Sequence, residues 1–348
     1  HLPKNRDQSV VPRSSVPHTL MPKTVVKKAA KLVGMFGQGY ARMFREGELT
    51  LGLNFPIEAY PRNPVPQMKD QIELAQMVET AGFAALWTRD VPLLDPSFGD
   101  AGQNYAPWAW LGYVAAKTNN IALATGAIIL PLRAPVDIAK AAASIDHLSN
   151  GRLVMGTASG DRPVEYSIYE VPYDTRGKTF AKTFEFIRSA TQAPPGWDMQ
   201  EAGLSGQLHL IPKAHAGRIP MLVTGRSRQT LEWVAEHADG WLMYPQPIPA
   251  QTQVLGAWRA ALEGAEQSWK PFSQSLYIDL IEDPTAPPTP IHLGYRLGRD
   301  ALMQHLSASR DIGVNHITLN LRFSSREIRE VVSELGNEVL PAFPTIQP

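Results

Sequence analysis

The sequence predicts an α/β fold, a (β/α)8 TIM barrel with insertions and an N-terminal extension. From Leu49 onward, eight short apolar runs alternate with segments of helical periodicity, which is the rhythm of parallel β/α units. No G-x-G-x-x-G motif follows the first run, so a doubly wound open sheet is the weaker alternative. The expected strands cover residues 49–57, 84–90, 121–131, 151–160, 219–225, 239–245, 275–284 and 316–322.

A helical segment is expected after each strand. The clearest ones cover residues 67–82, 107–118, 135–148, 176–191 and 227–237. The first should end at Gly82, because glycine readily adopts the left-handed conformation that follows a helix. A Pro/Gly-rich insertion covers 193–218, and a short proline-rich loop covers 284–290.

Composition excludes several classes of function. The 33 basic and 33 acidic residues balance, so no global field attracts nucleic acid. The absence of cysteine excludes disulfides, thiolate catalysis and cysteine-based metal sites, and the nine histidines lack H-x-x-x-H or H-E-x-x-H spacing, so no metal site is expected. The longest apolar run is about ten residues, far below the ~20 needed to cross a bilayer. We expect a soluble, cytoplasmic protein.

Residues 1–48 differ from the barrel domain expected at 49–348. Between Gln8 and Arg45 there are basic residues but no acidic ones, and apolar residues recur at helical spacing. The favoured interpretation is a helical arm that docks on its own barrel or on a partner subunit. The alternative is a basic amphipathic helix on a membrane surface.

Candidate ligand-binding residues follow the expected strands, since barrel chemistry sits at the carboxyl ends of strands. In "TGRSRQT" (224–230), Gly225, Ser227 and Thr230 offer amides and hydroxyls at a helix N-terminus, where phosphate binds, and Arg226 adds positive charge. The alternative is ordinary N-capping by the serine.

The stretch "ASGDRPVEY" (158–166) is a second candidate. Ser159 and Gly160 permit close approach of a ligand, and Arg162 offers a bidentate anion contact. The alternative is a tight turn with an exposed Asp161–Arg162 pair.

Two further features mark the barrel mouth. Arg89 and Asp90 end the second strand, either as an inward pair that bonds a heterocycle or as a salt bridge on the rim. Gly126 and Ala127 put two small side chains inside the third strand, which usually means that something approaches the backbone there.

Three stretches together resemble the bacterial luciferase-like flavin monooxygenase family. They are "GFAALWTRD", "IALATGAIILPLRAPVDIAKAAASIDHLSNGRLVMGTASGDR" and "GRSRQTLEWVAEHADGW", and the resemblance covers roughly residues 49–340. It implies a TIM barrel that holds FMN, or F420 in some branches, at its carboxyl-end mouth. In the family, reduced flavin reacts with oxygen and an organic substrate is oxidised.

The resemblance also implies roles for individual residues. Phosphate contacts map to Ser227 and Thr230 and to the loop around Ser159, and the acidic residue near the flavin ring maps to Asp90. A non-proline cis peptide bond behind the ring maps to Gly126–Ala127. The luciferase histidine that follows the acidic residue is replaced by Val91, which makes aldehyde-dependent light emission improbable and puts oxygen activation in question.

The expected function is therefore FMNH2- and O2-dependent monooxygenation of a small organic molecule, with Asp90 and Arg89 as the candidate catalytic residues. The resemblance implies a separate flavin reductase as partner and a homodimer. The alternatives are F420-dependent hydride transfer and a flavin-binding protein without catalysis. An apolar substrate is expected because six aromatic residues are predicted to wall the pocket: Phe55, Tyr105, Trp108, Tyr166, Tyr244 and Phe323.

Overall fold

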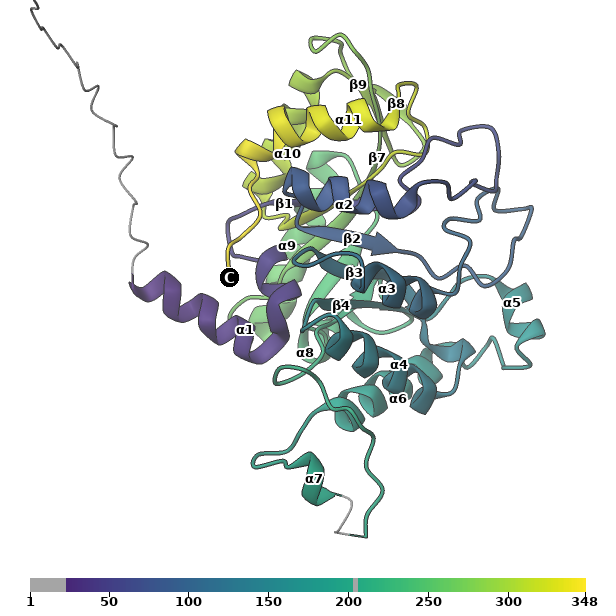
Figure 1. The fold of residues 1–348 in the computed structure, drawn as a ribbon, viewed down its shortest axis with the longest axis vertical. Helices are drawn as coiled ribbons and strands as arrows, with labels where there is room; N and C mark the ends of the chain where they lie inside the picture. Colours follow the sequence, from purple (N-terminus) through teal and green to yellow (C-terminus); the bar gives the residue numbers. More distant parts are fainter. Residues whose placement is uncertain (1–22, 203–205) are drawn as a thin grey trace, which may run out of the picture.

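Eight parallel strands form a closed barrel in the computed structural model, which describes residues 23–202 and 206–348 (Figure 1). Closure follows from the pairing of β10 with β1 on one side and with β7 on the other. Each strand overlaps one of the expected runs, so the predicted (β/α)8 barrel is confirmed. The barrel strands are β1 (Thr50–Asn54), β2 (Ala85–Thr88), β3 (Ala122–Ile129), β4 (Leu153–Ala158), β5 (Met221–Thr224), β6 (Gly240–Met243), β7 (Phe272–Leu280) and β10 (His316–Asn320).

Helices surround this barrel, and their apolar faces pack against the outer surface of the strands (Figure 1). The α-helices that follow the first strand are α2 (Gln71–Ala81), α3 (Pro107–Ala115), α4 (Pro135–Leu148), α5 (Pro163–Ile168), α6 (Arg176–Thr191), α7 (Met199–Ala202), α8 (Leu231–His237), α9 (Ile248–Gly264), α10 (Arg299–Ile312) and α11 (Ile328–Glu334). Shorter 3-10 or π segments are η1 (Leu130–Leu132), η2 (Leu335–Val339) and η3 (Leu340–Ala342).

Two of the five helices match their expected ranges residue for residue, whereas α2, α3 and α8 are shorter than expected. α4 and α6 begin and end where the sequence predicts, and α2 stops at Gly82, whose φ is 98°. α8 begins at Leu231 rather than at Ser227. Ser227 and Arg228 have φ values of 46° and 66°, which are incompatible with a right-handed helix.

The sequence did not predict the hairpin of β8 (Thr289–Ile291) and β9 (Gly294–Leu297). Its first strand falls partly in the proline-rich loop at 284–290 and carries Pro290, so the sequence signal was that of a loop. β9 pairs in parallel with the end of β7, from Tyr277 to Leu280. The turn of the hairpin therefore lies beside the carboxyl-end mouth of the barrel.

The second half of α1 (Lys23–Met43) packs against the amino-terminal ends of the strands. Gly37 and Gly39 lie so close to Gly151 and Arg152 that a Cβ on either glycine would be 2.5 Å or less from a backbone oxygen. The buried aromatic residues at this end close the barrel opposite its mouth. They are Phe36, Tyr40 and Phe44, and with Met43 they pack on Ala85, Trp87, Ala122, Ala124, Val154, Leu222 and Leu242.

Residues 1–22 of the expected basic arm lie outside the described residues. The division between an arm at 1–48 and a barrel domain at 49–348 stays a prediction. Among the described residues, no helix combines the length and the apolar character that a membrane crossing requires.

Candidate active site

A cavity of about 840 Å³ opens at the carboxyl ends of the barrel strands. Ligand sites of barrel proteins occupy this position, and the volume lies within the usual range for small-molecule sites. Eleven of the twelve predicted site residues line it: Arg89, Asp90, Gly126, Ala127, Ser159, Gly160, Asp161, Arg162, Gly225, Arg226 and Ser227. The twelfth, Thr230, does not.

The floor of the cavity contains the Gly126–Ala127 peptide bond, which is cis, as the resemblance predicted. These two residues fall in a register shift between β3 and β4, where pairing skips from Thr125 to Ile128. A Cβ on Gly126 would lie 3.1 Å from the Trp87 ring. The space that the glycine leaves is therefore filled in part by Trp87.

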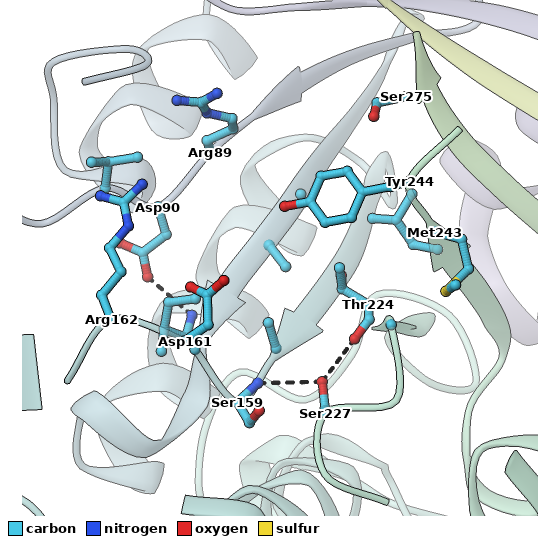
Figure 2. A pocket seen from close by; sticks show the side chains of 18 of the residues that line it. Arg89, Asp90, Ser159, Asp161, Arg162, Thr224, Ser227, Met243, Tyr244 and Ser275 are labelled. Atoms are coloured by element: carbon cyan, nitrogen blue, oxygen red, sulfur yellow. Dashed lines mark hydrogen bonds between the residues drawn. The ribbon is translucent and has the colours of Figure 1, made fainter. Parts of the chain in front are cut away.

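Ser159 and Ser227 join two loops on one side of the cavity (Figure 2). The Ser159 N–H donates to Ser227 Oγ at 3.3 Å, and that hydroxyl donates to the Thr224 carbonyl at 2.9 Å. Ser227 is thus not the helix cap that the sequence suggested. Thr230 is the cap, since its Oγ1 accepts from the Trp233 N–H at 3.1 Å at the start of α8.

Three polar atoms of residues that line the cavity have no hydrogen-bond partner among the described residues. Arg162 Nη1, Arg176 Nε and Thr224 Oγ1 are buried and make no hydrogen bond within the described chain. Arg162 lies over the Phe98 ring at 4.1 Å and approaches Glu165 at 3.7 Å, so the Asp161–Arg162 pair is not formed. Asp161 is exposed. The side lined by Ser159, Thr224 and Ser227 is termed the Ser159 side, and its hydroxyl groups are suited to an anion.

Both carboxylate oxygens of Asp90 accept hydrogen bonds from within the protein. Its side chain has no exposed surface, and its two oxygens receive bonds of 2.5 and 2.7 Å from Arg133. The Ile129 N–H adds a third bond at 3.1 Å (Figure 2). Asp90 therefore ties the end of β2 to the end of β3, next to the cavity floor. The expected Arg89–Asp90 pairing was wrong.

Arg89 instead takes part in a separate ionic cluster. Its Nη1 lies 2.9 Å from Asp100 and 3.3 Å from the Tyr277 hydroxyl, and Arg322 lies 3.1 Å from the same carboxylate. Burial raises the pKa of Asp100, but Arg89, the Gly102 N–H and Arg322 outweigh this and lower it overall. All four side chains border the cavity.

The sequence did not single out Asp100, Arg133, Tyr277 and Arg322. Asp100 lies in a long loop whose composition indicated a pocket wall, and Arg322 lies in a segment that follows the last strand. Both segments could be located from the sequence. Which charged side chain pairs with which could not, because the partners lie on different loops whose paths the sequence does not give: Asp90 pairs with Arg133, and Asp100 with both Arg89 and Arg322.

The predicted aromatic wall was wrong for five of its six residues, since only Tyr244 lines the cavity. Phe55 is buried against Trp110, with the ring centroids 5.1 Å apart. Tyr166 is also buried and donates a hydrogen bond to the Ser159 carbonyl. The lining is consequently rich in charged side chains rather than aromatic ones.

Comparison with known proteins supports the same fold and identifies the family. The family model of luciferase-like monooxygenases matches residues 49–285. An uncharacterized protein of Mycobacterium tuberculosis is 29% identical over 196 residues, which cover 50% of this chain and 67% of the relative.

Two solved structures share the fold. An F420-dependent secondary alcohol dehydrogenase, bound to an F420–acetone adduct, has a TM-score of 0.67 and 15% identity, with 85% of this chain and 99% of that chain covered. The oxygenating constituent of 3,6-diketocamphane monooxygenase from Pseudomonas putida, in complex with FMN, has a TM-score of 0.66 and 13% identity, with 86% and 99% covered. With more than half of its length matched by the family model, the chain belongs to the luciferase-like monooxygenases, a family of enzymes.

Proposed function

We propose that the protein is a flavin-dependent monooxygenase that uses reduced FMN and O2 to oxidise a small organic substrate. The observation that carries the proposal is the combination of two surfaces in one cavity. An apolar floor, formed by Gly126–Ala127, Trp87 and Leu242, is continuous with the donor-rich Ser159 side. Such a cavity suits a ligand with a flat ring and an anionic tail.

The residues present fit FMN. Three polar atoms of Arg162, Arg176 and Thr224 lack a hydrogen bond within the described chain and lie on residues that line the cavity, so a phosphate or its ribityl chain bound there could supply one. Gly225 leaves room for close approach, since no atom lies within 4 Å of a Cβ added there. Ser159, Ser227, Arg176 and Arg226 would hold the phosphate, and the floor would hold the ring.

The flavin supplies the redox chemistry, whereas the protein binds, orients and excludes water. Asp90 acts as a positioning residue, because its carboxylate holds the Ile129 N–H and Arg133 behind the floor. Arg89 contributes a positive charge that faces the cavity. Val91 also lines the cavity, so the position of the luciferase histidine carries no proton-transfer group.

A second candidate is F420-dependent hydride transfer. It is supported by the equal structural likeness to an F420 enzyme and to an FMN enzyme, with TM-scores of 0.67 and 0.66. We also propose a homodimer that receives reduced flavin from a separate reductase.

Cofactor reconstitution tests these candidates. The protein is titrated with FMN, FAD and F420, and binding is followed by the change in cofactor fluorescence. We expect saturable FMN binding, and oxygen uptake with reduced FMN that increases when a substrate from an organic panel is added. Binding of F420 without FMN, together with turnover in the absence of oxygen, would favour the second candidate. FMN binding without any substrate-dependent oxygen uptake would indicate a non-catalytic flavin protein.

A further inference from the structure

A second basic region lies across the cavity from the Ser159 side. It consists of Arg89, Asp100, Tyr277 and Arg322, which we call the Arg89 corner. Figure 2 shows Arg89 and Ser275 on one side of the pocket, well separated from Ser159 and Ser227 on the other. A ligand group held at this corner is therefore distinct from one held at the Ser159 side.

The Arg89 corner carries a net positive charge. Two guanidinium groups share Oδ2 of a single carboxylate, at 2.9 Å from Arg89 and 3.1 Å from Arg322. Burial raises the pKa of Tyr277, so this neighbour stays neutral. Asp90 adds no compensating charge, because Arg133 already neutralises it. Two positive charges against one negative charge leave an excess of one.

Donor groups at the corner remain unused. Within the described chain, the hydrogen bonds of Arg89 all use Nη1, and Nη2 and Nε lie beside Gly102 without a hydrogen-bond partner. Arg322 Nη2 donates to the Gly99 carbonyl and Nη1 pairs with Asp100, whereas Nε is buried without a hydrogen-bond partner. Both side chains are largely buried, with exposed fractions of 20% and 12%, so an uncompensated charge here is poorly solvated. A bound oxyanion relieves that cost and fits the planar fork of arginine.

We propose that the Arg89 corner binds a carboxylate of the substrate, which makes the substrate a small organic acid rather than a neutral apolar molecule. This rests on the proposed function, since it assigns the Ser159 side to the phosphate of the cofactor. The hairpin turn between β8 and β9 supplies His292 and Leu293 to the same cavity, and it provides the wall against which the organic part of the acid packs.

The test compares acids with their neutral isosteres. Benzoate, phenylacetate, hexanoate and decanoate are each paired with the corresponding primary amide, and all are titrated by calorimetry into the FMN-loaded protein. We expect at least one acid to bind about tenfold or more tightly than its amide, as a charge-assisted bidentate contact implies. Arg89→Gln and Arg322→Gln should each reduce this ratio to about twofold or less.

Three further variants separate the corner from other effects. Arg322→Lys keeps the charge without the fork, so it should retain part of the acid preference. Arg226→Gln, on the Ser159 side, should weaken FMN binding and leave the acid-to-amide ratio unchanged. Arg310→Gln removes an arginine of α10 outside the cavity and should change neither quantity.

The outcomes are distinct. Equal binding of acids and amides, no acid binding, or an acid preference that persists in both glutamine variants would overturn the proposal. So would a loss of FMN affinity in those variants as large as that of Arg226→Gln, because the corner would then serve the cofactor. If the wild-type protein binds no FMN, the proposed function fails. The acid and amide titrations are then repeated without cofactor, and an acid preference that depends on Arg322 would still support the corner. If the glutamine variants do not fold, Arg322→Lys decides, and an acid-to-amide ratio unchanged from the wild type in that variant would overturn the proposal.

Discussion

The indole N–H of Trp87 donates a 2.9 Å hydrogen bond to Nε2 of His316 inside the barrel. Because an indole nitrogen only donates, Nε2 must be unprotonated, and the proton of the neutral ring lies on Nδ1. Nδ1 lies 2.8 Å from the Thr50 hydroxyl, which in turn donates to the Met43 carbonyl. A continuous set of bonds thus links the end of α1 to the cavity floor.

The first prediction concerns the pH dependence of stability. Burial lowers the pKa of His316 to about 3, whereas the unfolded residue titrates near 6.5. Between these values the unfolded state binds more protons, so stability falls as the pH falls. The expected contribution of this residue between pH 8 and pH 5 is a loss of about 2 kcal/mol. Urea unfolding at the two pH values should show a smaller loss for His316→Gln than for the wild type. An equal loss in both would contradict the assignment.

The second prediction concerns the glycine of the floor. Gly126→Ala places a methyl group 3.1 Å from Trp87, which its bond to His316 holds in place. We expect a loss of about 1–3 kcal/mol in unfolding free energy, typical of overpacking, and weaker FMN binding. The matched control is Gly256→Ala, an exposed position of α9 where no atom lies within 4 Å of the added methyl. The control should be neutral or stabilising by up to about 1 kcal/mol. Wild-type stability and FMN affinity in Gly126→Ala would show that the floor tolerates crowding.

The third prediction separates phosphate binding from helix capping. Ser227→Ala removes the hydroxyl that accepts from the Ser159 N–H, so FMN affinity should fall by about tenfold, or ~1.4 kcal/mol. Affinity for riboflavin, which lacks the phosphate, should stay nearly constant. Thr230→Ala should instead lower stability by about 1 kcal/mol and leave the FMN-to-riboflavin ratio unchanged. A changed ratio in Thr230→Ala would restore this residue to the phosphate site.

The fourth prediction concerns Asp90. Asp90→Asn leaves Arg133 without its buried counter-charge, and we expect a loss of about 3 kcal/mol in unfolding free energy. Arg133→Gln should be destabilising as well, because both residues act through the same contact. Turnover at a temperature where the variants are folded should fall only moderately. A stable Asp90→Asn protein without turnover would mean that Asp90 is catalytic rather than positioning.

The sequence predicted the barrel because hydrophobic periodicity and the residues that end helices and strands are local signals. Gly82, for example, ends a helix through its own backbone conformation. The candidate residues at strand ends were also located well, since the barrel topology brings all carboxyl ends of the strands to one mouth. Their membership of the cavity could thus be predicted. Their roles as ligands of a cofactor stay predictions.

Side-chain partners were not predictable in the same way. Asp90 pairs with Arg133 and Arg89 pairs with Asp100, because the irregularity in β3 and the paths of the loops decide which charged side chains come together. The prediction of an aromatic pocket wall from composition was also wrong, because Phe55 and Tyr166 are buried in the protein interior. An aromatic residue near a strand end has two directions available, and only packing chooses between them.

The packing of α1 across the amino-terminal end of the barrel has a consequence for access to the cavity. With Phe44 and Tyr40 seated below Trp87, molecules reach the floor from the opposite, carboxyl end. A ring that rests on Gly126–Ala127 and an acid at the Arg89 corner would then share the same entrance. The closed end of the barrel thus makes cofactor and substrate traffic pass through one mouth, so each would have to enter and leave past the same loops.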